Sequence, residues 1–384
     1  MDETEILLIE DHEAMRERIT RQIEAAAEET DSSARLTVID ESNANTLVGA
    51  GDISNEMALA EGIRGQYPNA ALIVVDHDLS NLKNPAISES SITAAAHTLA
   101  IPVCRYHRQP SGASLRIDAL WELNARVYSI DLEAPSEAEN ENHRFGTEVL
   151  NILEGFKQIA SGYQALEEPV RKKGAPAVLS HILDKPALED FFAAYSEGIP
   201  FLNDMLIVRK LMEESPQEGA ERVSRPAPDN LNRRIPYMLG YWLHNFILRF
   251  PGLILNEVAA ASYLDIDTED FKKEAVLRCF DEARYEGPFS RGRKYWWRPL
   301  LDDLLIEQGG RDEILQAEDL DPQSVGRSKS HASGKSPAGY YDIFSGLPIS
   351  KEDSIGSLSW IPSGADLARV DRNLYEEIAP ILGI

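Results

Sequence analysis

The chain has 384 residues, 43% of them hydrophobic, and its 38 basic and 64 acidic side chains give a formal net charge of −26. This length predicts two domains instead of a single core. The charge disfavours nucleic acid as a partner, because such a surface repels phosphates, and it suits partners that are proteins or cations. Charged residues interrupt every window of about 18 residues, so no membrane span is predicted.

The start of the chain and its cysteines bear on the cellular compartment. The opening MDETEILLIEDHEAM is acidic and lacks a small-residue cleavage site, which is unlike a secretory signal. The only cysteines are Cys104 and Cys279, both in apolar surroundings. Two such thiols favour a reducing compartment over a disulfide framework. The sequence therefore predicts a cytoplasmic protein.

The first third of the chain alternates short apolar runs with stretches of helical pattern. The expected strands cover residues 6–9, 36–39, 71–76, 101–105 and 126–130. The expected helices between them cover residues 13–28, 55–66, 90–99 and 115–124. Strands that alternate with helices indicate βαβ units. The prediction is an α/β domain over residues 1–143, with a doubly wound, five-stranded parallel sheet.

The rest of the chain has a different pattern. Residues 144–320 show mostly helical periodicity, which predicts a mainly α-helical output or interaction domain. Within it, Pro251 and Gly252 divide a long apolar stretch into two expected helices. Residues 321–339 are rich in Ser, Gly, Lys and His and predict a flexible linker or loop. The C-terminal segment 340–384 ends in an amphipathic helical pattern and is expected to dock on the helical domain.

Acidic side chains follow two of the predicted strands. Glu10 and Asp11 come after the first strand, and Asp76 and Asp78 end the segment ALIVVDHD after the third. Ligands of open α/β sheets bind at the carboxyl ends of the strands, so we expect three carboxylates from these two strand ends to share one crevice. Their mutual repulsion would be relieved by a hard cation such as Mg²⁺. The residues thus predict a site that suits a hard cation.

With these residues the first 135 or so positions resemble the response-regulator receiver domain, the CheY-like module of two-component signalling. The resemblance implies that Glu10 and Asp11 bind Mg²⁺. It also implies that the protein is a phosphoprotein, with Asp76 as the residue that accepts the phosphoryl group. It also implies that Asp76 and the backbone carbonyl of Asp78 contact the metal. A histidine kinase or a kinase-like ATPase is the implied partner. Such a site positions the nucleophile and neutralises the charge on the transferred group.

Two positions depart from the pattern of that family. Tyr106 and His107 follow the fourth strand, where the family has a Ser or Thr, and Ala134-Pro135 stand where the family has Lys-Pro. Loss of a fixed cation from a site that gathers a dianion weakens phosphorylation. The alternative expectation is a pseudo-receiver, in which the acidic cluster is vestigial and the domain is a platform for protein binding.

Three histidines follow strand ends beside these carboxylates, namely His12, His77 and His107. Imidazole together with carboxylate is a ligand set for transition metals. The spacing of these histidines matches no recognised metal signature. A site with histidine ligands is therefore kept as an alternative to the all-oxygen magnesium site.

A basic and aromatic cluster stands out in the predicted helical domain. Its interaction candidates are Arg291, Arg293, Tyr295, Trp296 and Trp297. Arginine and aromatic residues dominate the hot spots of protein interfaces, and they also stack on bases. The simpler interpretation, which we favour, places the aromatic residues in the core at a helix start and leaves the arginines as its solvated flank. A protein partner ranks next, and nucleic acid last.

The SGKS sequence at residues 333–336 lacks the first glycine of a phosphate-binding P-loop and has no strand before it. An NTP site is therefore excluded there. We expect a phospho-accepting regulator, whose output domain binds a protein partner, and no independent catalyst. The alternative is an enzyme in the helical domain under the control of a pseudo-receiver. A self-associating scaffold such as a homodimer is the third interpretation.

Overall fold

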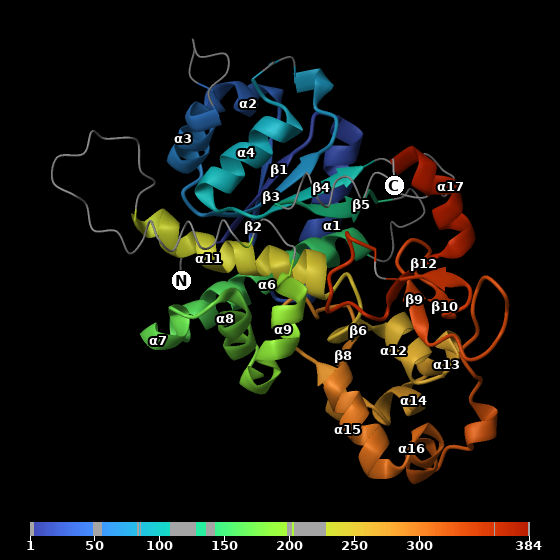
Figure 1. Ribbon diagram of the computed structural model, residues 1–384. Coiled ribbons are helices and arrows are strands. Elements are labelled where there is room, and N and C mark those ends of the chain that lie inside the picture. Colours follow the sequence, from blue (N-terminus) through green and yellow to red (C-terminus); the bar gives the residue numbers. More distant parts are fainter. Residues whose placement is uncertain are drawn as a thin grey trace. The chain divides into compact units, whose positions relative to one another are not determined.

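The computed structural model describes residues 4–48, 56–82, 84, 86–107, 128–135, 143–197, 202, 228–356 and 358–382, and the statements below concern these residues. They fall into two compact units (Figure 1). Among the described residues, the first unit takes those within 4–107, 128–135, 143–164 and 228–241, and the second takes those within 165–197, 202 and 242–382. The described chain thus passes from the first unit to the second, returns to the first for residues 228–241, and then continues in the second. The predicted domain boundaries after residues 143, 320 and 339 stay predictions.

The first unit is built on a five-stranded, all-parallel sheet with the order β2-β1-β3-β4-β5 (Figure 1). The strands are β1 Glu5–Ile9, β2 Arg35–Ile39, β3 Ala70–Asp76, β4 Val103–His107 and β5 Ile130–Glu133. The predicted α/β class and the five parallel strands are confirmed. The last strand begins later than predicted, with Ile130 and Leu132 as its buried side chains. The helix predicted at residues 115–124 lies outside the described residues.

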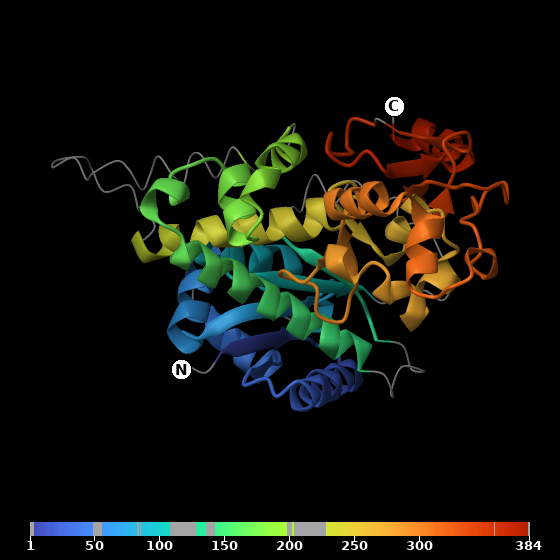
Figure 2. The same cartoon turned by 90° about the horizontal axis from the view of Figure 1, so that it is seen from below.

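Helices pack on both faces of this sheet (Figure 2). They are α1 Glu13–Glu29, α2 Glu41–Leu47, α3 Glu56–Gln66, α4 Glu89–Leu99, α6 Arg144–Ala165 and α11 Pro228–Trp242. Alternate strand residues such as Ile73 and Val75 share a core with α2, α3 and α4. On the other face, the ring of Tyr106 meets Phe145 of α6 edge-on. Burial of both faces is typical of parallel sheets.

Helix α11 belongs to the first unit as far as Tyr241. Between α6 and α11, the chain passes through the second unit. The backbone N–H of Val103, where β4 begins, donates to the hydroxyl of Tyr241 at 2.8 Å. The hydroxyl of Tyr237 lies 3.2 Å from Nδ1 of His97. Burial raises the pKa of Tyr241 far above its usual value. These buried contacts fix α11 against the sheet domain.

The second unit combines helices with two small sheets. Its helices are α7 Glu168–Arg171, α8 Ala175–Ile182, α9 Glu189–Ser196, the π-helix Leu243–Ile247, α12 Glu257–Tyr263, α13 Thr268–Phe271, α14 Glu274–Arg278, α15 Arg298–Gln308, α16 Arg311–Ala317 and α17 Arg372–Leu382. One sheet has the order β6-β8-β7, with β6 Ile254–Asn256, β7 Arg284–Tyr285 and β8 Tyr295–Trp297. The other has the order β10-β9-β12-β11, with β9 Tyr340–Asp342, β10 Pro348–Ile349, β11 Ser354–Ile355 and β12 Ala368–Asp371. The sequence pattern did not predict these sheets.

The segment 321–339 packs into the second unit through polar contacts. The N–H of Gly326 donates to Asp270 at 2.6 Å, and the hydroxyl of Ser330 donates to Asp353 at 2.5 Å. Most of the segment is loop, as one of the two predicted alternatives has it. The ion pair of Arg327 with Asp265 and the buried side chain of Val325 anchor it as well.

Candidate metal centre

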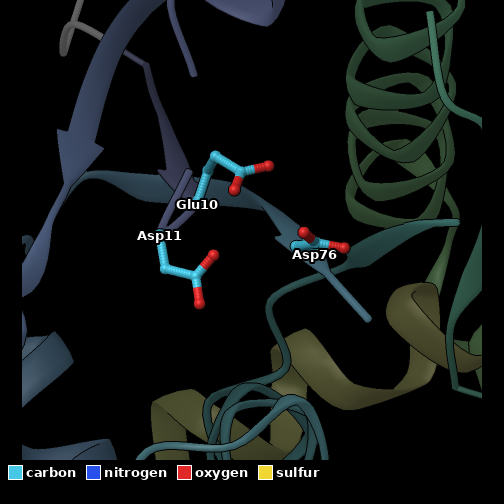
Figure 3. Close-up of side chains that lie close together, drawn as sticks. All are labelled: Glu10, Asp11 and Asp76. Atoms are coloured by element: carbon cyan, nitrogen blue, oxygen red, sulfur yellow. The ribbon is translucent and has the colours of Figure 1, made fainter. Parts of the chain in front are cut away.

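Three carboxylates meet where β1 and β3 end. Glu10 and Asp11 directly follow β1, and Asp76 is the last residue of β3. These strands are parallel neighbours, and Ile9 pairs with Val75. Both strands therefore end at the same edge of the sheet. One carboxylate oxygen of each acidic residue lies within 4.8 Å of the other two, and Figure 3 shows Glu10 and Asp11 extending toward the side on which Asp76 lies. The predicted convergence of these residues is confirmed.

The cluster is largely shielded from solvent. Glu10 is 0% exposed and Asp76 is 3% exposed, while Asp11 is half-buried. Carboxylates that lie this close repel one another, and water screens that repulsion poorly at buried positions. A cation held between the three oxygens would turn the repulsion into attraction.

Both oxygens of Glu10 have hydrogen-bond donors. Oε1 accepts the backbone N–H of His12 at 2.6 Å, and Oε2 accepts the hydroxyl of Tyr106. Two donors on two oxygens fix the plane of the carboxylate. Because each carboxylate oxygen has a second lone pair, Glu10 can still bind a metal ion in this orientation.

The other two carboxylates are also fixed by backbone donors. Oδ2 of Asp11 accepts the N–H of Asn81 at 2.7 Å, in the short 3₁₀ helix Ser80–Leu82 that follows β3. Oδ1 of Asp76 accepts the N–H of Asp78 at 3.3 Å. The loop after β3 is therefore tied to the cluster at two points.

The donor set of this cluster consists of carboxylate oxygens. Such ligands suit hard cations, and Mg²⁺ binds through one or a few carboxylates while it keeps several waters. Among the described residues the cluster includes no histidine. His12 contributes its backbone N–H, and the half-exposed ring of His77 lies 3.9 Å from Glu89. The side chain of His107 lies outside the described part, and the carbonyl of Asp78 remains a predicted ligand.

The strand register locates the two departures from the receiver pattern. Tyr106 lies opposite Asp76 in the pairing of β3 with β4, which is where the resemblance implies a Ser or Thr. Ala134 and Pro135 directly follow β5. From the sequence, Tyr106 was noted only because it stands where a Ser or Thr was expected. Its hydrogen bond to Glu10 was not predicted. A tyrosine at a strand end beside an acidic strand end was the available signal.

A buried arginine lies on β4 beside Tyr106. Arg105 is 0% exposed, its Nη2 lies 2.6 Å from Oδ1 of Asp131, and its Nη1 lies 4.0 Å from Oε1 of Glu89. Sequence reasoning also missed this network. The signal was a cation inside an apolar strand, since a buried charge needs charged or hydrogen-bonding partners.

The aromatic interaction candidates of the second unit are core residues. Tyr295, Trp296 and Trp297 form β8, the central strand of its sheet, and are 6%, 0% and 4% exposed. They cannot offer their rings to a partner, so their assignment as interaction residues is corrected. The simpler interpretation is right about the core, and the aromatic strand does lead into a helix, because Trp297 is the N-cap of α15. Arg291 and Arg293 are exposed.

A Ser, a His and an Asp also meet in the second unit. Nε2 of His331 lies 3.4 Å from Asp342 and 3.4 Å from the hydroxyl of Ser345, which itself donates to Asp342 at 2.6 Å. In a catalytic triad the serine and the aspartate contact opposite nitrogens of the imidazole. Here both face the same nitrogen. This group is therefore no nucleophilic triad, and it lends no support to an enzyme in this unit.

No family model, curated protein or solved structure matches the chain. The acidic cluster and the topology of the sheet are therefore the observations from which function is inferred. In the part of the chain that the structure describes, every helix is too short or too polar to cross a membrane.

Proposed function

We propose that the protein is a signalling regulator whose α/β unit binds Mg²⁺ between Glu10, Asp11 and Asp76 and accepts a phosphoryl group on Asp76. The observation that carries this proposal is the meeting of three carboxylate oxygens within 4.8 Å at the carboxyl edge of the sheet. The strand order 2-1-3-4-5 is that of flavodoxin-like and CheY-like sheets. Ligands of such sheets bind at that edge.

The chemistry follows from the position of Asp76. One of its oxygens accepts the N–H of Asp78, and the other is the nucleophile that attacks phosphorus. The bond from phosphorus to the donor's leaving atom breaks, an acyl phosphate forms, and the leaving nitrogen or oxygen takes up a proton. Bound Mg²⁺ would neutralise charge on the transferred group. The absence of a lysine at Ala134-Pro135 makes this reaction slower than in receivers that have one.

The proposed partners follow from the same chemistry. A histidine kinase or a kinase-like ATPase would supply the phosphoryl group in the cytoplasm. The second unit would then act through a protein partner. Its aromatic strand β8 is buried, so the contact surface for that partner lies elsewhere.

The test uses the full chain with Mg²⁺ and a small phosphodonor such as acetyl phosphate, followed by intact mass spectrometry. We expect one phosphoryl adduct on the wild type and none on Asp76→Asn or in the presence of a chelator. The matched control is Asp78→Ala, which removes a side chain that accepts the N–H of Ser80 and keeps the backbone carbonyl. Mg²⁺ binding without an adduct, with either a small donor or a phosphohistidine donor, would contradict phosphorylation and leave a metal-binding pseudo-receiver.

A further inference from the structure

We infer that Tyr106 is a positioning residue of the metal centre: its hydroxyl holds Glu10 in the orientation that binds the cation. The inference rests on the proposed function, because it concerns the same site. In this inference Tyr106 orients the metal ligand Glu10 and does not contact the phosphoryl group.

The reach of the side chain supports this role. In the sheet order, β3 lies between β1 and β4, so Tyr106 and Glu10 are on strands separated by one other strand. Two strand spacings amount to roughly 10 Å. A serine or threonine hydroxyl lies only one bond beyond Cβ and spans much less of that gap than a phenol does. The long phenol of Tyr106 does so and donates to Oε2.

The phenol ring is itself held in place. Tyr106 is 0% exposed, and its ring meets Phe145 of α6 at a centroid distance of 5.8 Å and an interplanar angle of 89°. Such edge-to-face packing favours one ring orientation. The hydroxyl is thus directed at Glu10 by the packing of α6, and the N–H of His12 holds the second oxygen.

A tyrosine hydroxyl has a single proton to donate. Since Tyr106 donates it to Glu10, the same proton is not available to a phosphoryl oxygen on Asp76. Hydrogen-bond partners of metal ligands fix ligand orientation, and their loss lowers metal affinity by about 10- to 100-fold. Tyr106 therefore affects phosphorylation through the cation.

The test compares Mg²⁺ binding by the full-length wild type, Tyr106→Phe and Tyr241→Phe, using titration calorimetry. Tyr106→Phe keeps the ring and its contact with Phe145, and we expect it to lower the affinity about tenfold at unchanged stoichiometry. Tyr241→Phe is the matched control, because it also removes a buried hydroxyl bonded to β4, at the end of the strand opposite to the cluster. It should bind Mg²⁺ as the wild type does.

A second readout follows the phenol directly. Mg²⁺ should change the near-ultraviolet absorption of tyrosine in the wild type and in Tyr241→Phe, and the change should be absent from Tyr106→Phe. Absence of this change in the wild type at saturating Mg²⁺ overturns the inference, even if Tyr106→Phe does not fold.

The other outcomes separate the inference from the proposed function. Equal Mg²⁺ affinity of Tyr106→Phe and the wild type overturns the positioning role and leaves the metal centre intact. Equal weakening by Tyr106→Phe and Tyr241→Phe shows a general effect of losing a buried hydroxyl, which also overturns it. Failure of the wild type to bind Mg²⁺ overturns the proposed function.

Discussion

The two units use their acidic side chains differently. In the first unit, the oxygens of Glu10, Asp11 and Asp76 converge on one another within 4.8 Å. In the second unit, Asp353 instead accepts hydroxyls from serines such as Ser330 and Ser350. A carboxylate surrounded by hydroxyls is satisfied by the protein alone. Carboxylates that face one another need a proton or a cation, and this difference separates a structural acid from a candidate ligand site.

The largest effect on stability should come from Arg105, the buried arginine next to Tyr106 on β4. Replacing Arg105 by Met keeps much of the side-chain volume but leaves Asp131 without its buried cation, 2.6 Å away. We expect a loss of about 3–5 kcal/mol in the free energy of unfolding, since a buried charge is left uncompensated. Urea denaturation followed by circular dichroism measures it.

The control for Arg105 is Arg327→Ala. Arg327 also binds aspartates, Asp265 at 2.8 Å and Asp312 at 3.2 Å, but its side chain is 51% exposed. Removing an exposed ion pair costs about 1 kcal/mol or less. If Arg105→Met were as mild as this control, Arg105 would be only a peripheral contact of the first unit.

Replacement of Asp76 should change the free energy of unfolding by a smaller amount and in the opposite direction. Asp76→Asn removes one of three converging charges, and in the absence of metal it should raise the free energy of unfolding by roughly 1–2 kcal/mol. The same change should remove the stabilisation by Mg²⁺, which amounts to about 2.7 kcal/mol when Mg²⁺ is at 100 times its dissociation constant. Thermal unfolding with and without Mg²⁺ measures both effects.

Asp78→Asn is the comparison for this prediction. The side chain of Asp78 accepts the N–H of Ser80 at 3.0 Å and is not part of the cluster. Asp78→Asn should still be stabilised by Mg²⁺. Without Mg²⁺, its free energy of unfolding should not rise above that of the wild type. Metal-free destabilisation by Asp76→Asn would show that the three carboxylates do not repel and would remove the argument for a cation.

The sheet and the acidic cluster could be predicted because both follow from local pattern. Runs such as LIVV at residues 72–75 identify buried parallel strands, and parallel strands that end together bring Glu10, Asp11 and Asp76 to one edge. The bond from Tyr106 to Glu10 could not be predicted, since it crosses an intervening strand. It depends on ring packing against Phe145, which lies far along the chain.

The second unit was harder to predict for a related reason. Its strands are two to four residues long, which is too short for a period of two to be recognised. The segment from Tyr295 to Trp297 was therefore assigned only to a helix start. It leads into α15 at Arg298, but pairing with β6 and β7 also makes it a central strand. The return of α11 to the first unit depends on long-range contacts such as Tyr241 with Val103.

The smallest expected change in the free energy of unfolding concerns Asp353 of the second unit. Hydrogen bonds from Ser330 and Ser333, with a further one from Ser350, lower the pKa of Asp353 below its usual value. A depressed folded-state pKa gives stability that is present above the unfolded pKa, near 3.9. That stability is lost as the pH falls through the lower folded value. Asp353→Asn should cost about 1 kcal/mol at neutral pH, because solvent screens this half-buried carboxylate.

The pH dependence distinguishes Asp353 from an ordinary exposed carboxylate. The difference in unfolding free energy between the wild type and Asp353→Asn should be constant above about pH 5 and should shrink below pH 4. The exposed neighbour Glu352 provides the control, since Glu352→Gln should change stability by less than about 0.5 kcal/mol. A difference for Asp353→Asn that persists unchanged at pH 3 would mean that the serines bind the side chain equally well without its charge. Asp353 would then not be the charge-stabilised counterpart of the three converging carboxylates.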